Sequence, residues 1–473
     1  METITFKDPG TRTEGHIAVE ITVDTKGGLQ QIVGAKCSGT LFSGFETLLY
    51  GRNPLDAPLI IQHICGVYPI AHGQAAVQAL ENVSGWLPPT NARLLRNLKL
   101  GANFLQSHIL HFYLQAVLDF VAGPATSPWS PAWRVDMRPG LDSVAANLPA
   151  ALGARRRAHE MGCVFGDRMP GTNTFIPGGF TTVPNARDID RYRQHLSALE
   201  DFIESTYLPD VQRLGRTYCD YFEIGGGCRN LRAYGAFEMN DANITRLFRS
   251  GCSEAGSFDI RSITASGYIH QAARSHQNDS HSNKDNSLTE GKGTDADYGD
   301  FQVLNALQLP GKPYETGPLA RMWINGDYQR TISVMDRHVA RALEAAKIAS
   351  AMAGWLNELI PGQNAFDDSF TQHSGSGTGL SESPGGALGH RVNITDQKIT
   401  DYLVVTPSCW NASRSADQQI SGPMEQALIG TPIKIPEQPV EALRVIHSFD
   451  PCLSCTVQIM RPGEKQVAIH TEG

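Results

Sequence analysis

The feature that most constrains this chain is a cysteine pair near its C-terminal end, Cys452 and Cys455, separated by two residues. A Cys-x-x-Cys pair places two sulfurs within reach of one metal ion or of each other. Alone, the pair fits a thioredoxin-like redox pair, half of a zinc site or half of a larger cluster site. The other half must be sought upstream, where Cys65 lies between His63 and His72 in the segment HICGVYPIAH.

Composition excludes several classes of protein. The chain has 473 residues, enough for two or three ordinary domains or for one large intertwined domain. It is 41% hydrophobic and only 19% charged, which is typical of a soluble globular protein with a large core. The net charge of -8 and the pI near 6.0 argue against nucleic-acid binding.

Two features of the sequence bear on where the protein is located. No run of about 18 apolar residues is present, so we expect no transmembrane segment. The first residues lack the basic and apolar regions of a signal peptide. We therefore expect a cytoplasmic protein by default, with a periplasmic or membrane-associated location as the alternative if a partner carries an export signal.

Hydrophobic periodicity predicts a mainly helical chain with small strand elements. Alternation over residues 17–23 and 29–33, around the turn at Gly27–Gly28, predicts two strands. Apolar residues at three- and four-residue steps predict long helices over 91–121 and about 185–222.

The segments between these elements are predicted to be loops. Residues 122–150 are rich in Pro, Ala and Ser and are read as a surface loop. Residues 272–300 are polar and rich in Gly, Asn, Ser and Asp, which predicts a long exposed loop.

The two cysteine segments resemble the two motifs of the nickel-iron hydrogenase large subunit, R-x-C-G-x-C-x-x-x-H and D-P-C-x-x-C-x-x-H. The positions kept are Cys65, Gly66, His72, Asp450, Pro451, Cys452 and Cys455. Further family-like segments occur at residues 11–16, 37–46, 108–120, 314–322, 336–342, 377–390 and 406–412. The resemblance therefore covers nearly the whole chain.

The resemblance implies roles for individual residues. Cys65, Cys452 and Cys455 would be metal ligands, and His72 would belong to the same cofactor-binding region. Glu14 would be the first proton relay, although a surface carboxylate at a strand start is the other interpretation of that residue. Glu46 would bind magnesium through a hard oxygen. The remaining two cofactor-binding residues would be Asp119, a carboxylate near the metals, and Ser408, whose hydroxyl would contact an iron cyanide.

The resemblance also implies a fold, a cofactor and partners. The fold would be the hydrogenase large-subunit fold, a bundle of long helices with small α+β elements, forming one intertwined domain over residues 1–473 because its first and last motifs must meet. The cofactor would be a nickel-iron centre with cyanide and carbon monoxide ligands. The partners would be an iron-sulfur small subunit and dihydrogen as substrate.

Several positions depart from the family pattern around that one cofactor. Tyr68 stands where the family has a bridging cysteine, and Gly385 stands where it has an arginine over the metals. Gln458 replaces the histidine that binds magnesium and after which the family's precursor is cut, so a tail over 459–473 would remain. The other departures are His63 for arginine, and Leu114 and Gly171 for histidines.

Two functional hypotheses follow from these departures. In the first, the chain is a hydrogenase with an unusual ligand set, a redox enzyme that splits or forms dihydrogen. In the second, the fold persists without the standard centre, and the chain is a structural subunit or assembly factor of a redox complex. Without that centre, three states of the cysteines stay open: a Cys3His zinc or iron site completed by His72 or His63, a Cys452–Cys455 redox disulfide, or protonated thiols with no cofactor.

Overall fold

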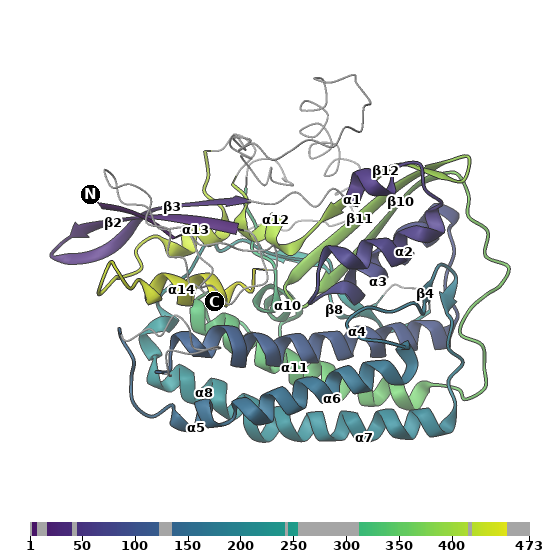
Figure 1. Ribbon diagram of the computed structural model, residues 1–473, viewed down its shortest axis with the longest axis horizontal. Coiled ribbons are helices and arrows are strands. Elements are labelled where there is room, and N and C mark those ends of the chain that lie inside the picture. The colour runs from purple at the N-terminus through teal and green to yellow at the C-terminus, as the bar shows by residue number, and fades with distance from the viewer. Residues whose placement is uncertain are drawn as a thin grey trace, which may run out of the picture.

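The computed structural model describes residues 2–6, 17–39, 45–122, 135–241, 245–253, 312–414 and 419–451. Two predicted features, the polar loop at 272–300 and the tail at 459–473, lie outside these residues. Figure 1 shows long helices gathered on one side of the molecule, with two three-stranded sheets above them.

The described helices are of two kinds. The long ones are α3 (Pro69–Ser84), α4 (Thr90–Leu110), α6 (Leu148–Gly166), α7 (Ala186–Phe202), α8 (Leu208–Thr217) and α11 (Val334–Glu358). The shorter ones are α1 (Phe45–Leu49), α2 (Ala57–Ile60), α5 (Asp142–Ala146), α10 (Pro318–Asn325), α12 (Pro407–Ala412), α13 (Pro423–Leu428) and α14 (Val440–Ser448).

Helices α4, α6, α7 and α11 pack against one another and lie side by side in the lower half of Figure 1. The central helix α4 is buried almost along its whole length, as expected for a helix with few charges after Lys99. It continues as a π-helical segment (His111–Ala116) and a 3-10 turn (Val117–Asp119). The helix predicted over 91–121 is thereby confirmed, with a change of hydrogen-bonding pattern near its end.

The other predictions for this helical layer had mixed outcomes. The helix predicted over about 185–222 is confirmed as α7, a π-helical turn (Ile203–Tyr207), α8 and a 3-10 turn (Cys219–Phe222). The loop predicted over 122–150 is wrong for its second half, which contains α5 and the first turn of α6. Proline is well tolerated in the first turn of a helix, so Pro149 lies within α6 and does not mark a loop.

Lys99 on α4 caps the C-terminal end of α6 within the core. Its buried ammonium donates hydrogen bonds to the carbonyls of Gly162 (3.0 Å), Gly166 (3.1 Å) and Arg168 (2.5 Å). The last carbonyls of a helix lack partners within it and carry partial negative charge, so a cation at this position stabilises them.

We expect Lys99→Met to lower the free energy of unfolding by about 2–3 kcal/mol, because it leaves buried carbonyls without a donor. Denaturant unfolding followed by circular dichroism measures this loss. The matched control is Lys347→Met, which removes a partly exposed ion pair with Asp327 and should cost less than about 1 kcal/mol. Equal losses in the two variants would contradict the role assigned to Lys99.

Two antiparallel three-stranded sheets are described. The first consists of β1 (Glu2–Phe6), β2 (Ile17–Lys26) and β3 (Leu29–Gly39), which confirms the predicted strand pair around Gly27–Gly28. The second consists of β10 (Gly375–Ser383), β11 (Gly386–Thr395) and β12 (Lys398–Val405). Three two-stranded ribbons complete the strands: β4 (Phe175–Ile176) with β5 (Gly179–Phe180), β6 (Leu231–Ala233) with β9 (Gly251–Ser253), and β7 (Ala236–Glu238) with β8 (Arg246–Phe248).

Strand β10 of the second sheet packs directly against the backbone of α3, and two glycines in the strand make this close approach possible. A Cβ atom added at Gly377 would come within 2.1 Å of the Ala79 carbonyl oxygen, and one at Gly379 within 1.9 Å of the Ala75 carbonyl oxygen. Only glycine permits this approach of strand to helix backbone. Since α3 starts after Tyr68 and β10 ends just before Gly385, this packing brings the two altered positions to the same place.

Segments from the two ends of the described chain contact each other directly. The amide of Ile32 donates to the carbonyl of Thr431 at 3.0 Å, and the amide of Cys37 donates to the Glu425 carboxylate at 2.8 Å. In the described part of the chain, no helix is long and apolar enough to span a membrane.

Candidate metal centre

Cys65 sits at the entrance to α3. A 3-10 turn (Ile61–Ile64) ends before it, Cys65 itself is extended, and Pro69 occupies the first turn of α3, where proline is favoured. The Tyr68 amide donates a hydrogen bond to the Cys65 sulfur at 3.3 Å. Cys65 is buried, so its sulfur faces the interior next to the positive end of a sixteen-residue helix.

The second motif meets the first through Tyr68. Asp450 follows α14 with a left-handed backbone (φ 53°), and its Oδ2 accepts a hydrogen bond from the Tyr68 hydroxyl at 2.6 Å. Both side chains are buried. The structure therefore brings the start of the D-P-C-x-x-C motif onto the first cysteine motif. Cys452 and Cys455 lie outside the described residues, so the convergence of the three sulfurs stays a prediction.

The Tyr68 ring also covers Gly385. A Cβ atom at Gly385 would lie 3.3 Å from Tyr68 Cε2, 3.4 Å from the Tyr68 hydroxyl and 3.5 Å from the Asp450 carbonyl. The shortest of these distances is tighter than most contacts of a real Cβ atom, and the other two are at or near ordinary van der Waals contact. The tyrosine ring thus lies where a longer side chain at position 385 would begin, and the two departures from the family pattern are in contact.

Arg321 forms hydrogen bonds with the turn that carries Gly385. The guanidinium donates to the carbonyls of Ser383 (3.0 Å) and Pro384 (2.8 Å), and it pairs with the buried carboxylates of Glu344 and Glu382. The turn is therefore fixed in place although it lacks the family's arginine.

Arg341 on α11 supplies positive charge beside Asp450. Its Nη2 lies 4.0 Å from Asp450 Oδ2, and its guanidinium approaches the Ser448 carbonyl at 3.4–3.5 Å. Arg341 is almost completely buried. A buried guanidinium therefore lies beside the carboxylate that accepts the hydrogen bond from Tyr68.

Asp119 also forms hydrogen bonds with residues of α14. Its carboxylate forms a hydrogen bond with His447 Nδ1, and its carbonyl accepts one from Arg444 at 2.9 Å. His111 Nε2 in turn contacts the His447 carbonyl at 2.6 Å. Burial lowers the pKa of His111 well below its usual value. Asp119 is therefore linked to the end of α14 that precedes Asp450, while its predicted place near the metals stays a prediction. His111 is neutral at physiological pH.

His72 points elsewhere. Its Nδ1 contacts His390 Nε2 at 3.1 Å, and His390 Nδ1 contacts the Tyr402 hydroxyl at 2.8 Å. Burial lowers the pKa of His72 to about 3, so its ring is neutral at physiological pH. Burial, and then the negative charge of Glu46, raise the pKa of the Tyr402 phenol.

Glu46 and Ser408 therefore belong to a second group. Glu46 lies on α1, and its charge also raises the pKa of Cys409, which burial raises most. The neighbouring Ser408 is buried on α12. The structure thus associates Glu46 with the His72 chain and with α12. Glu14, the predicted proton relay, lies outside the described residues.

The described donors can be tested against the family's cofactor. Among the described residues, no three His, Cys, Asp or Glu side chains gather where they could hold one metal ion. At the position of a bridging thiolate, a phenol is present and its proton is held by Asp450. Soft thiolates suit nickel and low-valent iron, and a protonated phenol is a poor substitute. The standard four-thiolate set does not fit this chain.

Sequence reasoning missed two features of this region. The segment 336–342 was noted only as family-like, and it supplies Arg341 beside Asp450 and the buried His338. Neither ring nitrogen of His338 has a hydrogen-bond partner among the described residues. The paired histidine and arginine on one helix were the available signal. The Tyr68–Asp450 hydrogen bond, by contrast, required the two ends of the chain to be placed in space.

Comparisons with known proteins identify the family. A family model described as nickel-dependent hydrogenase matches residues 43–131, 129–332 and 323–458. The chain belongs to the nickel-dependent hydrogenase family. Its family resemblance, predicted from the motifs, is confirmed, and it is a hydrogenase large-subunit family protein.

Individual relatives match over nearly their full lengths. The periplasmic NiFeSe hydrogenase large subunit of Desulfomicrobium baculatum is 36% identical, with 97% of this chain and 96% of the relative covered. The uptake hydrogenase large subunit of Bradyrhizobium diazoefficiens is 28% identical, with 98% and 96% covered. The reduced Ni-Fe-Se hydrogenase of D. vulgaris Hildenborough has a similar structure, with a TM-score of 0.84, 35% identity and 96% and 99% covered. The fold is therefore that of this hydrogenase family.

Proposed function

We propose that this family member does not assemble the standard four-thiolate nickel-iron centre and acts as a structural subunit of a redox complex. The observation that supports this most strongly is the hydrogen bond from the Tyr68 hydroxyl to Asp450 at 2.6 Å. It places a protonated phenol, a hard oxygen donor, where the family pattern has a bridging sulfur. Gly385 supports the same proposal, because the family pattern has an arginine there, the only permanently charged group of its site.

The partner proposed for this subunit is an iron-sulfur small subunit. The names of the relatives, which are hydrogenase large subunits, support this assignment. We further propose that long helices form the organising bundle and that residues 1–473 form one intertwined domain. The packing of α4, α6, α7 and α11 supports the first point, and the contact between Cys37 and Glu425 supports the second.

A second candidate function is a hydrogenase with an altered ligand set, acting on dihydrogen. The observation that favours it is the Cys65 sulfur, which is buried beside the N-terminus of α3 and accepts an amide hydrogen bond there, at the position of a metal-ligating cysteine in the family pattern. In that case the site would use Cys65, Cys452 and Cys455 as metal ligands, Glu14 as proton relay, Glu46 as magnesium ligand, and Ser408, Asp119 and His72 as cofactor-binding residues. A bound nickel-iron centre would supply the redox chemistry on dihydrogen.

A simpler metal site is a variant of the first proposal. Three cysteines would suffice for a single zinc or iron ion with one histidine. His72 is a weak candidate for that fourth position, because its Nδ1 is already paired with His390. His63 is exposed and has no such partner among the described residues.

The compartment proposed is the periplasm. The relative from Desulfomicrobium baculatum is described as periplasmic, which supports the periplasmic alternative over the cytoplasmic default.

Metal analysis with infrared spectroscopy decides between the two candidates. In protein purified anaerobically with its partner, we expect less than about 0.1 nickel per chain and no carbonyl or cyanide bands, since one bridging thiolate of the family's set is a phenol. Stoichiometric nickel together with those bands would overturn the structural proposal and establish the enzyme. Mass spectrometry of the C-terminus is the internal control, because an end at Gly473 is expected where no maturation cut occurs.

A further inference from the structure

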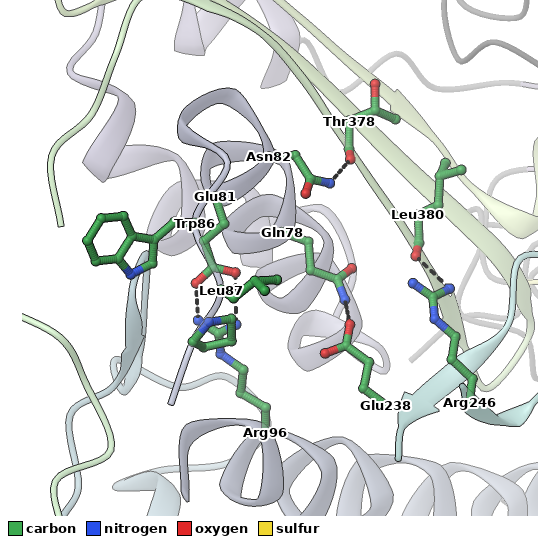
Figure 2. Close-up of a pocket in the computed structure, with 11 residues that line it drawn as sticks. Gln78, Glu81, Asn82, Trp86, Leu87, Arg96, Glu238, Arg246, Thr378 and Leu380 are labelled. Atoms are coloured by element: carbon green, nitrogen blue, oxygen red, sulfur yellow. Dashed lines mark hydrogen bonds and ion pairs between the residues drawn. The ribbon is translucent and has the colours of Figure 1, made fainter. Parts of the chain in front are cut away.

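A cavity of about 320 Å³ opens beside the C-terminal end of α3 (Figure 2). Tyr68 precedes the other end of this helix. It lies between the last turns of α3, the start of α4, the β7–β8 ribbon and strand β10. Its volume is within the range of small-molecule sites. None of its lining residues takes part in the candidate metal centre.

One pair of charges in this cavity is fully satisfied. Glu81 and Arg96 form a buried ion pair at 2.7 Å, with side chains 4% and 3% exposed. Arg96 also donates to the carbonyls of Ile176 and Gly179, and Glu81 accepts from the Gly178 amide. The two charges of this pair therefore neutralise each other on one wall of the cavity. Only the Nε of Arg96 has no partner among the described residues.

A second pair of charges is not satisfied. Glu238 and Arg246 are opposite each other on β7 and β8, yet they form no ion pair with each other. Glu238 uses Oε1 to accept from Gln78 Nε2 at 2.8 Å, as Figure 2 shows. Among the described residues, the other oxygen of this carboxylate has no hydrogen-bond donor.

Arg246, the positive member of this pair, has hydrogen-bond donors without an acceptor among the described residues. Only its Nη1 is engaged by described residues, with the carbonyls of Tyr234 (2.8 Å), Gly235 (3.1 Å) and Leu380 (3.3 Å). The Nε and Nη2 atoms remain available on a guanidinium that lines the cavity. That edge of a guanidinium is the one that binds a carboxylate through two parallel hydrogen bonds.

We propose that this cavity binds a small zwitterion, an α-amino acid with an apolar side chain. The ligand carboxylate pairs with the Nε–Nη2 edge of Arg246. Its ammonium donates to Glu238 Oε2, on the carboxylate that lines the cavity. The apolar side chain lies against Trp86 and Leu87, both on the cavity wall. A ligand with a single charge would leave one of the two protein charges unpaired.

Titration calorimetry of the full chain with L-leucine tests the site. We expect saturable binding of one molecule per chain. Leucinamide, which lacks the carboxylate, and 4-methylpentanoate, which lacks the ammonium, should each bind at least about tenfold more weakly. Equal binding of the three compounds would overturn the zwitterion assignment. No binding up to about 10 mM leucine would overturn the site itself, leaving water as its occupant.

Glu238→Gln locates the binding to this cavity. Glutamine keeps an acceptor for Gln78 but removes the charge, so leucine affinity should fall about tenfold to a hundredfold. Glu358→Gln is the matched control, because Glu358 lies at the exposed end of α11 outside the cavity and should leave affinity unchanged. Unchanged affinity in Glu238→Gln would show that leucine binds elsewhere. If that variant fails to fold, the analogue series on the unaltered chain still decides the question.

Discussion

Arg321→Met should lower the free energy of unfolding by about 3–5 kcal/mol, because it leaves two buried carboxylates without their cation. Arg321 is completely buried and pairs with Glu344 (2.6 Å) and Glu382 (2.8 Å). The variant also removes the donors to the carbonyls of Ser383 and Pro384, which hold the turn before Gly385. Urea or guanidinium unfolding followed by fluorescence measures the loss.

The loss should shrink as the pH falls. In the unaltered chain, burial opposes ionisation of Glu344, but Arg321 and the hydrogen bond with His108 outweigh it and lower the pKa of Glu344 to about 2. Since this pKa lies below the ordinary value of 4.5, the stabilisation is present above pH 4.5 and is lost as the pH falls towards 2. Without Arg321, the largest interaction that lowers the pKa of Glu344 is lost while burial still raises it, so the unpaired carboxylate becomes protonated at a higher pH than in the unaltered chain.

The control for this prediction is Arg193→Met, which removes an exposed ion pair with Asp190 and should cost less than about 1 kcal/mol. Comparable losses in the two variants, or a loss in Arg321→Met that grows between pH 7 and 5, would contradict the account of the buried network.

Tyr68→Cys and Gly385→Arg should each destabilise the chain alone and compensate each other when combined. Tyr68→Cys leaves a cavity and removes the hydrogen bond to Asp450, which we expect to cost about 3 kcal/mol. Gly385→Arg drives a side chain into the Tyr68 ring, only 3.3 Å from its first added carbon, and overpacking of this kind costs about 1–3 kcal/mol. In the double variant the arginine occupies the vacated space beside the Asp450 carboxylate.

A double-mutant cycle measures this compensation as a coupling free energy of about 1–3 kcal/mol. Additivity within about 0.5 kcal/mol would show that the two positions do not exclude each other. Gly153→Arg is the matched control for the glycine replacement. Gly153 lies on α6 with nothing within 4 Å of an added Cβ, so an arginine there should be neutral or slightly stabilising.

The helices were predictable because their signal is local. In α4 and α7 the apolar residues recur at helical spacing, and no tertiary contact is needed to see it. The change to π-helical hydrogen bonding at His111–Ala116 leaves that spacing nearly intact, so periodicity does not reveal it. The strand pair around Gly27–Gly28 was visible for the same local reason.

Strand β10 was not predictable from propensity. It contains glycines at 375, 377 and 379, a residue type that ordinarily weakens strands. The reason for them is tertiary: two of these glycines lie against carbonyls of α3, where any side chain would clash. Local patterns cannot report a requirement set by a helix about 300 residues earlier in the chain.

The candidate site was only partly predictable. Motif resemblance led to Cys65, Asp119 and Glu46, and it identified Tyr68 and Gly385 as departures. It could not show that these two departures touch, because their contact depends on how α3 meets the turn after β10. It also grouped His72 with the cysteines, which stays a prediction, and it gave no sign that His72 contacts His390, which in turn contacts Tyr402.

The pairing of distant segments has a consequence for biosynthesis. Ile32 and Cys37 bind to Thr431 and Glu425, and Tyr68 binds to Asp450, so the early segments find these partners only after most of the polypeptide has been made. A ribosome adds about 5–20 residues per second, so these early surfaces wait tens of seconds, apolar and exposed. Until then these early segments are open to unwanted contacts, and the contacts that join the two ends of the described chain form among the last events of folding.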